Sequence, residues 1–194
     1  MFQRREPRTV LQKLRELLWP SMGWGRMFKY VKHRLVRMSD TTHKIALGLG
    51  LGAAISFSPL LGTHFLQAAF IAYIFRANLM AAIIGTFIGN PWTFPFMWWI
   101  SLKIGSDLFN FIGLSAARNL PDELSPSILW NLLWEEPMRI FWPWMLGAYI
   151  CAAITAPIFY FICYRFIATA KLARTKARLR KVHLAAREVT GQKK

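Results

Sequence analysis

Two long uncharged segments, each broken near its middle by a proline, most strongly constrain how this chain can fold. Residues 45–75 and 77–102 contain no Lys, Arg, Asp or Glu. As a single helix the first segment would be about 46 Å long, against a bilayer hydrocarbon core of about 30 Å. Ser58-Pro59 and then Gly62 interrupt it, and a proline removes a backbone donor and clashes with the preceding turn. Each half is too short to cross a bilayer, so we expect the chain to bend or reverse at this break.

The second uncharged segment repeats this arrangement. It is interrupted by Asn90-Pro91, with Pro95 soon after, and Pro59 and Pro91 lie 32 positions apart. A run of small and apolar residues that begins with glycine precedes both breaks. Paired broken segments of this kind are the sequence feature that best indicates a transport-type binding site in a membrane protein.

Formal charge is concentrated at the two ends of the chain. The net charge is +16, although 55% of the residues are hydrophobic. Residues 1–44 contain eleven Lys and Arg, residues 165–194 contain ten, and the stretch between them contains four. Basic segments that border apolar spans lie on the cytoplasmic side and attract anionic lipid headgroups. We expect anionic membrane lipids as partners and no nucleic acid, because no zinc spacing or ribonucleoprotein motif accompanies the charge.

These patterns predict an all-α fold: an integral membrane helical bundle with Pro-broken or re-entrant hairpins and interfacial amphipathic helices. Because both ends are basic, both should be cytoplasmic and the number of complete crossings should be even. Either the first uncharged segment re-enters and the second crosses, or the first crosses and the second re-enters. The expected division is a basic interfacial segment over 1–44, a membrane domain over 45–164 with an acidic external loop over 103–140 and a span over 141–164, and a basic tail helix over 165–194.

Four further stretches place apolar residues at helical spacing among charges, namely residues 9–18, 28–38, 128–141 and 171–189. The two N-terminal stretches are too polar to span a bilayer. We expect them to lie in the cytoplasmic interface, and the alternative is a solvated basic arm. The third should rest on the external interface, and the fourth should continue from the last span into the cytoplasm.

A set of motifs over residues 42–105 carries a family resemblance. The motifs are Ile45-Ala46-Leu47-Gly48, Phe57-Ser58-Pro59 with Gly62, Arg76 with Asn78, Gly85-Thr86, Asn90-Pro91 with Thr93, and Gly105. Together they resemble a bacterial membrane family known only as a domain of unknown function, number two thousand and sixty-two. Members of that family often have a proline near the start of the first segment, where this chain has Thr42-His43. The resemblance implies a helical protein of the bacterial inner membrane and implies no activity.

Arg76 is the only formal charge between Lys44 and Lys103, and Asn78 follows it closely. A charge at membrane depth is costly and normally faces protein, water or a ligand. In one interpretation Arg76 binds an anionic headgroup or phosphate, which a guanidinium can hold with two hydrogen bonds. In the other, Arg76 ends the first segment at an interface and extends its charge into water.

Three other polar residues are candidates for substrate contact. Asn90 either binds substrate or caps the helix that follows the break. His64 and Gln67 lie one turn apart, so both should face one polar seam, as an interhelical hydrogen bond or as part of a proton pathway. No catalytic residue, metal site or cofactor is expected, because no acid–base pair, nucleophile motif or set of metal ligands occurs in the apolar segments. Cys151 and Cys163 both lie within an apolar run and should be buried.

Two hypotheses for function follow. The first is a small transporter or flippase-like protein for an anionic lipid or lipid-linked phosphate, which would need a second copy to enclose a path. The second is a non-catalytic membrane scaffold that recruits envelope partners through its basic ends.

Overall fold

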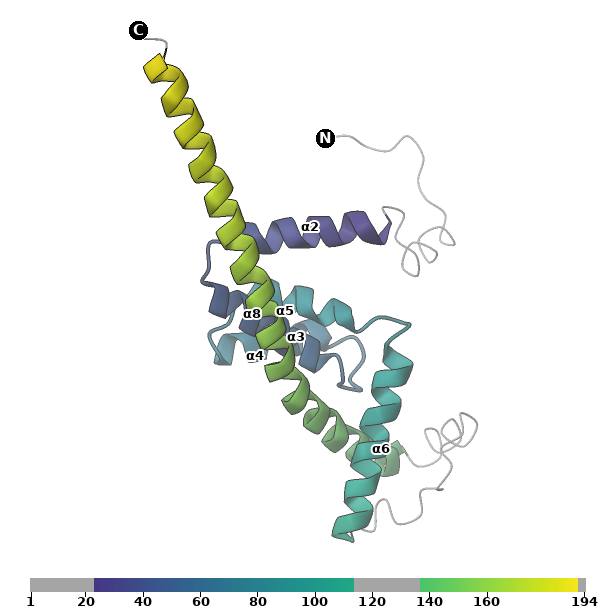
Figure 1. The fold of residues 1–194 in the computed structure, drawn as a ribbon. Coiled ribbons are helices and arrows are strands. Elements are labelled where there is room, and N and C mark those ends of the chain that lie inside the picture. Colours follow the sequence, from purple (N-terminus) through teal and green to yellow (C-terminus); the bar gives the residue numbers. More distant parts are fainter. Residues whose placement is uncertain (1–22, 114–136, 192–194) are drawn as a thin grey trace. The chain divides into compact units, whose positions relative to one another are not determined.

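The computed structural model describes residues 23–113 and 137–191, and every regular element in this part of the chain is a helix (Figure 1). The chain separates into two units, Met1–Met38 and Ser39–Lys194. In the first unit, α2 (Trp24–Arg37) confirms the helix expected over 28–38. The expected helix over 9–18 and the first part of the one over 128–141 lie outside the described residues.

The first uncharged segment forms two helices, α3 (Thr42–Ile55) and α4 (His64–Ile74). The side chain of Thr41 caps the start of α3 by accepting a hydrogen bond from the backbone N–H of Lys44 at 3.3 Å. Between the helices the chain turns through residues 56–63, and Gly62 adopts a φ of +83° that L side chains rarely adopt. The break predicted at Ser58-Pro59 is therefore confirmed.

The second uncharged segment divides into α5 (Leu79–Gly85), the short 3-10 helix η1 (Thr86–Ile88) and α6 (Phe94–Ile112). Residues 89–93 form the predicted break, and Pro95 lies in the first turn of α6, where its missing N–H costs no hydrogen bond. Helix α6 continues past Leu102, the last residue of the uncharged segment, to Ile112. Lys103 and Asp107 do not end the helix, since both are exposed and their charged atoms lie 3.8 Å apart one turn along it.

The last described element is α8 (Pro137–Gly191), a single helix of 55 residues that contains both the expected span and the expected tail helix (Figure 1). The helix runs through Pro143 and Pro157 and does not end at Tyr164. Within the described ranges, α8 is the one helix long and apolar enough to cross a membrane, whereas α3, α4 and α5–η1 are apolar but shorter. Helix length and composition thus establish one candidate span, fewer than the predicted even number of crossings.

Helices α3 and α5 run parallel to each other in close contact. A Cβ added to Gly48 would overlap the carbonyl oxygen of Asn78, and one added to Gly52 would overlap that of Ala82. Small residues at this spacing let two helix backbones approach directly. Helix α4 packs against α5, where Ala68 and Ala72 are buried with Ala82, and it returns toward the start of α3, because the N–H of Asn78 donates to Lys44 O at 2.9 Å.

Helix α8 packs against both α3 and α6; it crosses α3 and runs antiparallel to α6. His43 contacts the side chain of Tyr160, and Gly50, farther along α3, approaches the backbone of Ala156 and Tyr160. Along α6, a Cβ on Gly105 would overlap the carbonyl oxygen of Pro143, and one on Gly147 of α8 would overlap that of Ser101. After the break at residues 89–93 the chain changes direction, so α6 does not continue along the line of α5 (Figure 1).

Candidate functional site: the turn between helices α4 and α5

The turn that follows α4 is closed by two backbone hydrogen bonds. The N–H of Arg76 donates to Tyr73 O at 3.1 Å, and the N–H of Ala77 donates to Ala72 O at 2.8 Å. This pair of bonds defines a Schellman motif, in which the residue after the helix cap adopts the left-handed conformation. That residue is Arg76, with a φ of +52°, and it is the one described non-glycine residue with a positive φ. Glycine is the usual residue at this position, so the chain accepts a backbone cost of about 1 kcal/mol to place an arginine there.

Asn78 fixes this turn to the segment that leads into α3. Its backbone N–H donates to Lys44 O at 2.9 Å, and its side-chain amide donates to Asp40 Oδ2 at 2.5 Å. Its side-chain oxygen accepts from the N–H of Ala81 at 2.7 Å and so caps α5. Helices α3 and α4 therefore form a hairpin whose two ends meet.

Helix α8 joins the same cluster through Lys171, whose Nζ donates to the backbone oxygen of Asp40 at 2.6 Å. Lys44, Arg76 and Lys171 thus lie on segments that hydrogen bonds hold together, and Asp40 supplies the one carboxylate among these four residues. The cluster formed by Asp40, Lys44, Arg76, Asn78 and Lys171, which we call the basic turn, has a net charge of +2 at neutral pH.

The guanidinium of Arg76 is exposed, and it forms no hydrogen bond or ion pair with the described part of the chain. The residues that precede it are apolar and also exposed, with Tyr73 82%, Ile74 55% and Phe75 58% accessible. Large apolar side chains at these levels of exposure indicate a surface that contacts something other than water. Arg76 therefore stands at the edge between an apolar face and a basic cluster.

The polar atoms of Asn90 are used within the second break. Its side-chain oxygen accepts from the N–H groups of Trp92 and Thr93, at 2.9 Å and 3.1 Å. In return, the backbone N–H of Asn90 donates to Thr93 Oγ1 at 3.0 Å. This reciprocal arrangement closes the turn that leads into α6, so the side-chain oxygen of Asn90 stabilises the second break.

Ser56, which was not among the predicted site residues, joins the two breaks. Its hydroxyl is fully buried, lies 3.3 Å from Gly52 O and 3.2 Å from Thr86 O, and accepts from the N–H of Gly89 at 3.2 Å. The hydroxyl of Ser56 therefore links the end of α3 to the end of α5–η1 through hydrogen bonds with backbone groups of both. The available signal was the placement of a small polar residue shortly before each proline, Ser56 before Pro59 and Thr86 before Pro91.

His64 and Gln67 do not share the polar seam that their spacing predicted. The Nε2 of His64 lies 3.1 Å from Ser58 O, and its ring packs on Phe94, so the side chain is buried across the first break. Gln67 instead donates to Thr63 Oγ1 at 2.7 Å, within the first turns of its own helix. Of the five tentative binding residues, Arg76 is therefore the one whose side chain forms no hydrogen bond or ion pair with the described part of the chain.

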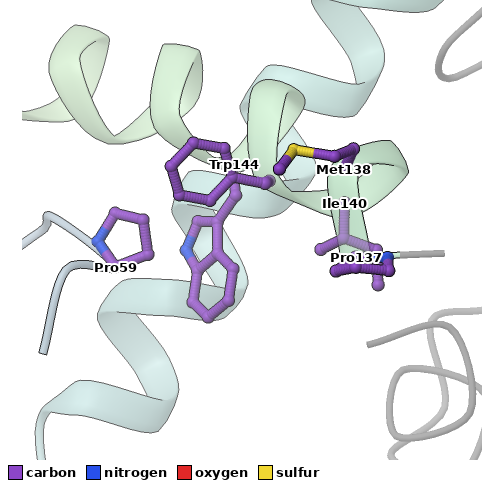
Figure 2. A pocket seen from close by; sticks show the side chains of 6 residues that line it. Pro59, Pro137, Met138, Ile140 and Trp144 are labelled. Atoms are coloured by element: carbon purple, nitrogen blue, oxygen red, sulfur yellow. The ribbon is translucent and has the colours of Figure 1, made fainter. Parts of the chain in front are cut away.

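A separate apolar pocket of about 220 Å³ lies between the tip of the α3–α4 hairpin and the start of α8 (Figure 2). Figure 2 shows Trp144 between Pro59 on one side and the first turn of α8 on the other. The indole N–H groups of Trp144 and of its neighbour Trp98 are buried without a hydrogen-bond partner in the described structure. The pocket is lined by Pro59, Pro137, Met138, Ile140, Phe141 and Trp144, so it offers apolar contact and no charge.

Neither cysteine has a disulfide partner in the described chain; Cys151 is buried, as expected, whereas Cys163 is only partly buried. The described residues bring together no group of three or more His, Cys, Asp or Glu side chains that could hold a metal ion.

A bacterial family described as "uncharacterized protein conserved in bacteria" (DUF2062) matches residues 25–176. The chain belongs to the DUF2062 family. No curated protein and no solved structure matches it. The family match extends from the start of α2 into α8 and includes the basic turn and both proline breaks, so these features lie within the DUF2062 domain.

Proposed function

We propose that this DUF2062 protein is a multi-pass protein of the bacterial inner membrane that binds an anionic lipid or lipid-linked phosphate at Arg76. In this proposal it acts as a small transporter or flippase-like protein. The observation that carries the proposal is the uncommitted guanidinium of Arg76, held in a left-handed turn where glycine would cost less.

The chemistry of the basic turn suits a phosphate group. A guanidinium can donate two parallel hydrogen bonds to phosphate oxygens, and the ammonium groups of Lys44 and Lys171 add positive charge on the adjoining segments. The exposed apolar residues of α4 that precede Arg76 suit acyl chains, which prefer hydrocarbon neighbours. An amphipathic anion could therefore place its phosphate at the basic turn and its acyl chains against the adjacent apolar residues of α4.

The arrangement of the helices supports one of the two topologies that the charge pattern left open. Because Asn78 is bonded to Asp40 and Lys44, α3 and α4 return to the side on which α3 begins, as a re-entrant hairpin does. Helices α5 and α6 would then form one broken crossing and α8 the second, with both chain ends in the cytoplasm. The parallel broken helices α3 and α5, joined at Ser56, supply the kind of interrupted segment found at transport sites.

Lipid retention tests the proposed binding site. The full chain is purified in nanodiscs that contain anionic and zwitterionic phospholipids, and the lipids it retains are counted by native mass spectrometry. Arg76→Gly removes the guanidinium and relieves the backbone, so we expect anionic lipid retention to fall about tenfold. Arg76→Lys should retain an intermediate amount, because an ammonium is a point charge without the bidentate geometry.

The control for this measurement is Lys103→Ala, which removes an exposed cation paired with Asp107 on α6. Its anionic lipid retention should equal that of the wild type. Equal retention by the wild type and Arg76→Gly would overturn the site.

Transport is tested by reconstitution. Liposomes that contain the wild-type protein should move a fluorescent anionic lipid between leaflets faster than protein-free liposomes, and Arg76→Gly should lower that rate. No acceleration by the wild type would exclude a flippase-like activity even if lipid is bound. Because a chain of this length encloses little volume, transport would require a second copy, which crosslinking in the same liposomes would detect.

The second candidate function is a membrane scaffold, and the length of α8 favours it. The helix continues past Lys171 as a basic segment whose side chains are exposed from residue 172 to residue 184, and a lipid transporter does not require such a segment. Deletion of residues 172–194, which spares Lys171 of the basic turn, should then abolish recruitment of a partner while leaving lipid retention at Arg76 unchanged.

A further inference from the structure

The part of α8 from residue 172 to residue 184 lies on the surface of its unit. Every side chain from residue 172 to residue 184 is exposed, including Leu172 at 57%, Leu179 at 53% and Val182 at 59%. These residues belong to the same uninterrupted helix as the candidate span (Figure 1). The exposed segment therefore continues along the helix axis of the candidate span.

This direction takes the segment away from the bilayer, if α8 crosses the membrane as the proposed function requires. Arg165 is the first charge after the apolar part of α8 and marks its cytoplasmic end. Lys176 is eleven residues farther, which is about 16 Å along a helix, and Arg180 is about 22 Å farther. At physiological ionic strength the attraction between exposed charges is largely screened beyond about 8 Å, so the attraction of these cations to the lipid headgroups weakens along the segment.

One side of the segment is apolar. Leu172, Thr175, Leu179 and Val182 recur at intervals of three and four residues, which places them on one face of a helix. The hydroxyl of Thr175 donates to Lys171 O at 3.1 Å, so it does not require an outside partner. This apolar stripe is the pattern by which one helix packs against another in a coiled coil.

Cations border the apolar stripe on both sides. Lys176 lies on one flank and Arg178 on the other, at the positions that face a partner helix in a two-stranded coiled coil. No Asp or Glu occurs in α8 before Glu188. Pairing with a second copy of this chain would set cation against cation, which disfavours self-association through the stripe.

We infer that the exposed segment of α8 is a docking surface for an acidic amphipathic helix of a partner protein. Apolar residues of that helix would cover the stripe, and its Asp and Glu side chains would pair with Lys176 and Arg178. A nucleic acid would satisfy the charges but would leave the apolar stripe in water. This docking surface belongs to the proposed scaffold function and rests on the proposed membrane crossing of α8, but it does not depend on lipid binding at Arg76.

The experiment uses the full chain in bacterial cells, with a photo-crosslinking amino acid at Thr175 in the stripe or at Ala177 on the opposite face. The probe at Thr175 should give an adduct whose mapped peptide is rich in Asp and Glu with apolar residues at heptad spacing, and the probe at Ala177 should not. Leu179→Glu should lower the Thr175 adduct at least tenfold, because it places a carboxylate in the stripe opposite an acidic partner. Leu184→Glu makes the same leucine-to-glutamate change on the opposite face, so it is the matched control and should leave the adduct intact.

Three results would overturn the inference: an adduct to nucleic acid, an adduct to a second copy of this chain, or no adduct that Leu179→Glu removes. The same measurement in the Arg76→Gly background separates it from the lipid site, since the partner adduct should persist there. Membrane-impermeant labelling of a cysteine at Thr175 reports independently whether this part of α8 lies in the cytoplasm.

Discussion

At the scale of single residues, the conformation of Arg76 gives the first prediction. Arg76→Gly and Arg76→Ala both remove the guanidinium, but only glycine adopts the left-handed conformation without a steric cost. We expect Arg76→Gly to be more stable than Arg76→Ala by about 1 kcal/mol. Thermal unfolding of both variants in the same detergent measures the difference, and equal melting temperatures would show that the turn relaxes when its side chain is removed.

The hydrogen bond between Asn78 and Asp40 gives a second prediction at this scale. Asn78→Asp keeps the cap on α5 but sets two carboxylates against each other, so it should destabilise the protein by about 1–3 kcal/mol. Combining it with Asp40→Asn restores one donor and one acceptor and should recover most of the loss. A double-mutant cycle by denaturant unfolding measures the coupling. Additive single effects would contradict the structural role assigned to Asn78.

At the scale of helices, the crossing of α6 and α8 depends on two glycines. A Cβ on Gly105 would overlap the backbone at Pro143, so Gly105→Ala must push the helices apart. Overpacking of this kind typically costs about 1–3 kcal/mol. Resistance to unfolding by SDS or heat measures the effect for the purified protein.

Gly25→Ala is the matched control for that experiment. Gly25 lies in α2, and an added Cβ there meets nothing within 4 Å. Because alanine is the better helix former, this change should be neutral or stabilising by up to about 1 kcal/mol. If Gly105→Ala and Gly25→Ala destabilised the protein equally, the loss in Gly105→Ala could not be attributed to the close contact between α6 and α8.

At the scale of the whole molecule, the proposed topology predicts which positions face the cytoplasm. Cys151 and Cys163 are first replaced by alanine, and single cysteines are then placed at Phe75, Ser127 and Thr175. A membrane-impermeant maleimide should label Ser127→Cys in intact spheroplasts, whereas Phe75→Cys and Thr175→Cys should react only after permeabilisation. Labelling of Phe75→Cys from outside would favour the alternative, in which the first uncharged segment crosses.

The sequence by itself determined the helical class, both breaks and the membership in a bacterial family. These properties are local. A run of apolar residues favours an environment without water, and a proline removes a backbone hydrogen bond wherever it occurs. The end of the uncharged segment at Leu102 did not determine how far the helix continues, and α6 extends to Ile112. Lys103 and Asp107 are exposed and lie one turn apart, so the helix accommodates them.

Only the tertiary structure decided that Arg76, among the polar candidates, is the one whose side chain forms no hydrogen bond within the described chain. Asn78, Asn90, His64 and Gln67 are each bonded to partners that depend on how the turns close, and for Asn78 the side-chain partner Asp40 is 38 positions away. The return of α4 to the start of α3 was equally undetermined, because a proline break specifies that a chain bends but not where it goes. Packing of glycine against backbone then fixes the direction, since only certain faces of α3, α5 and α8 can approach so closely.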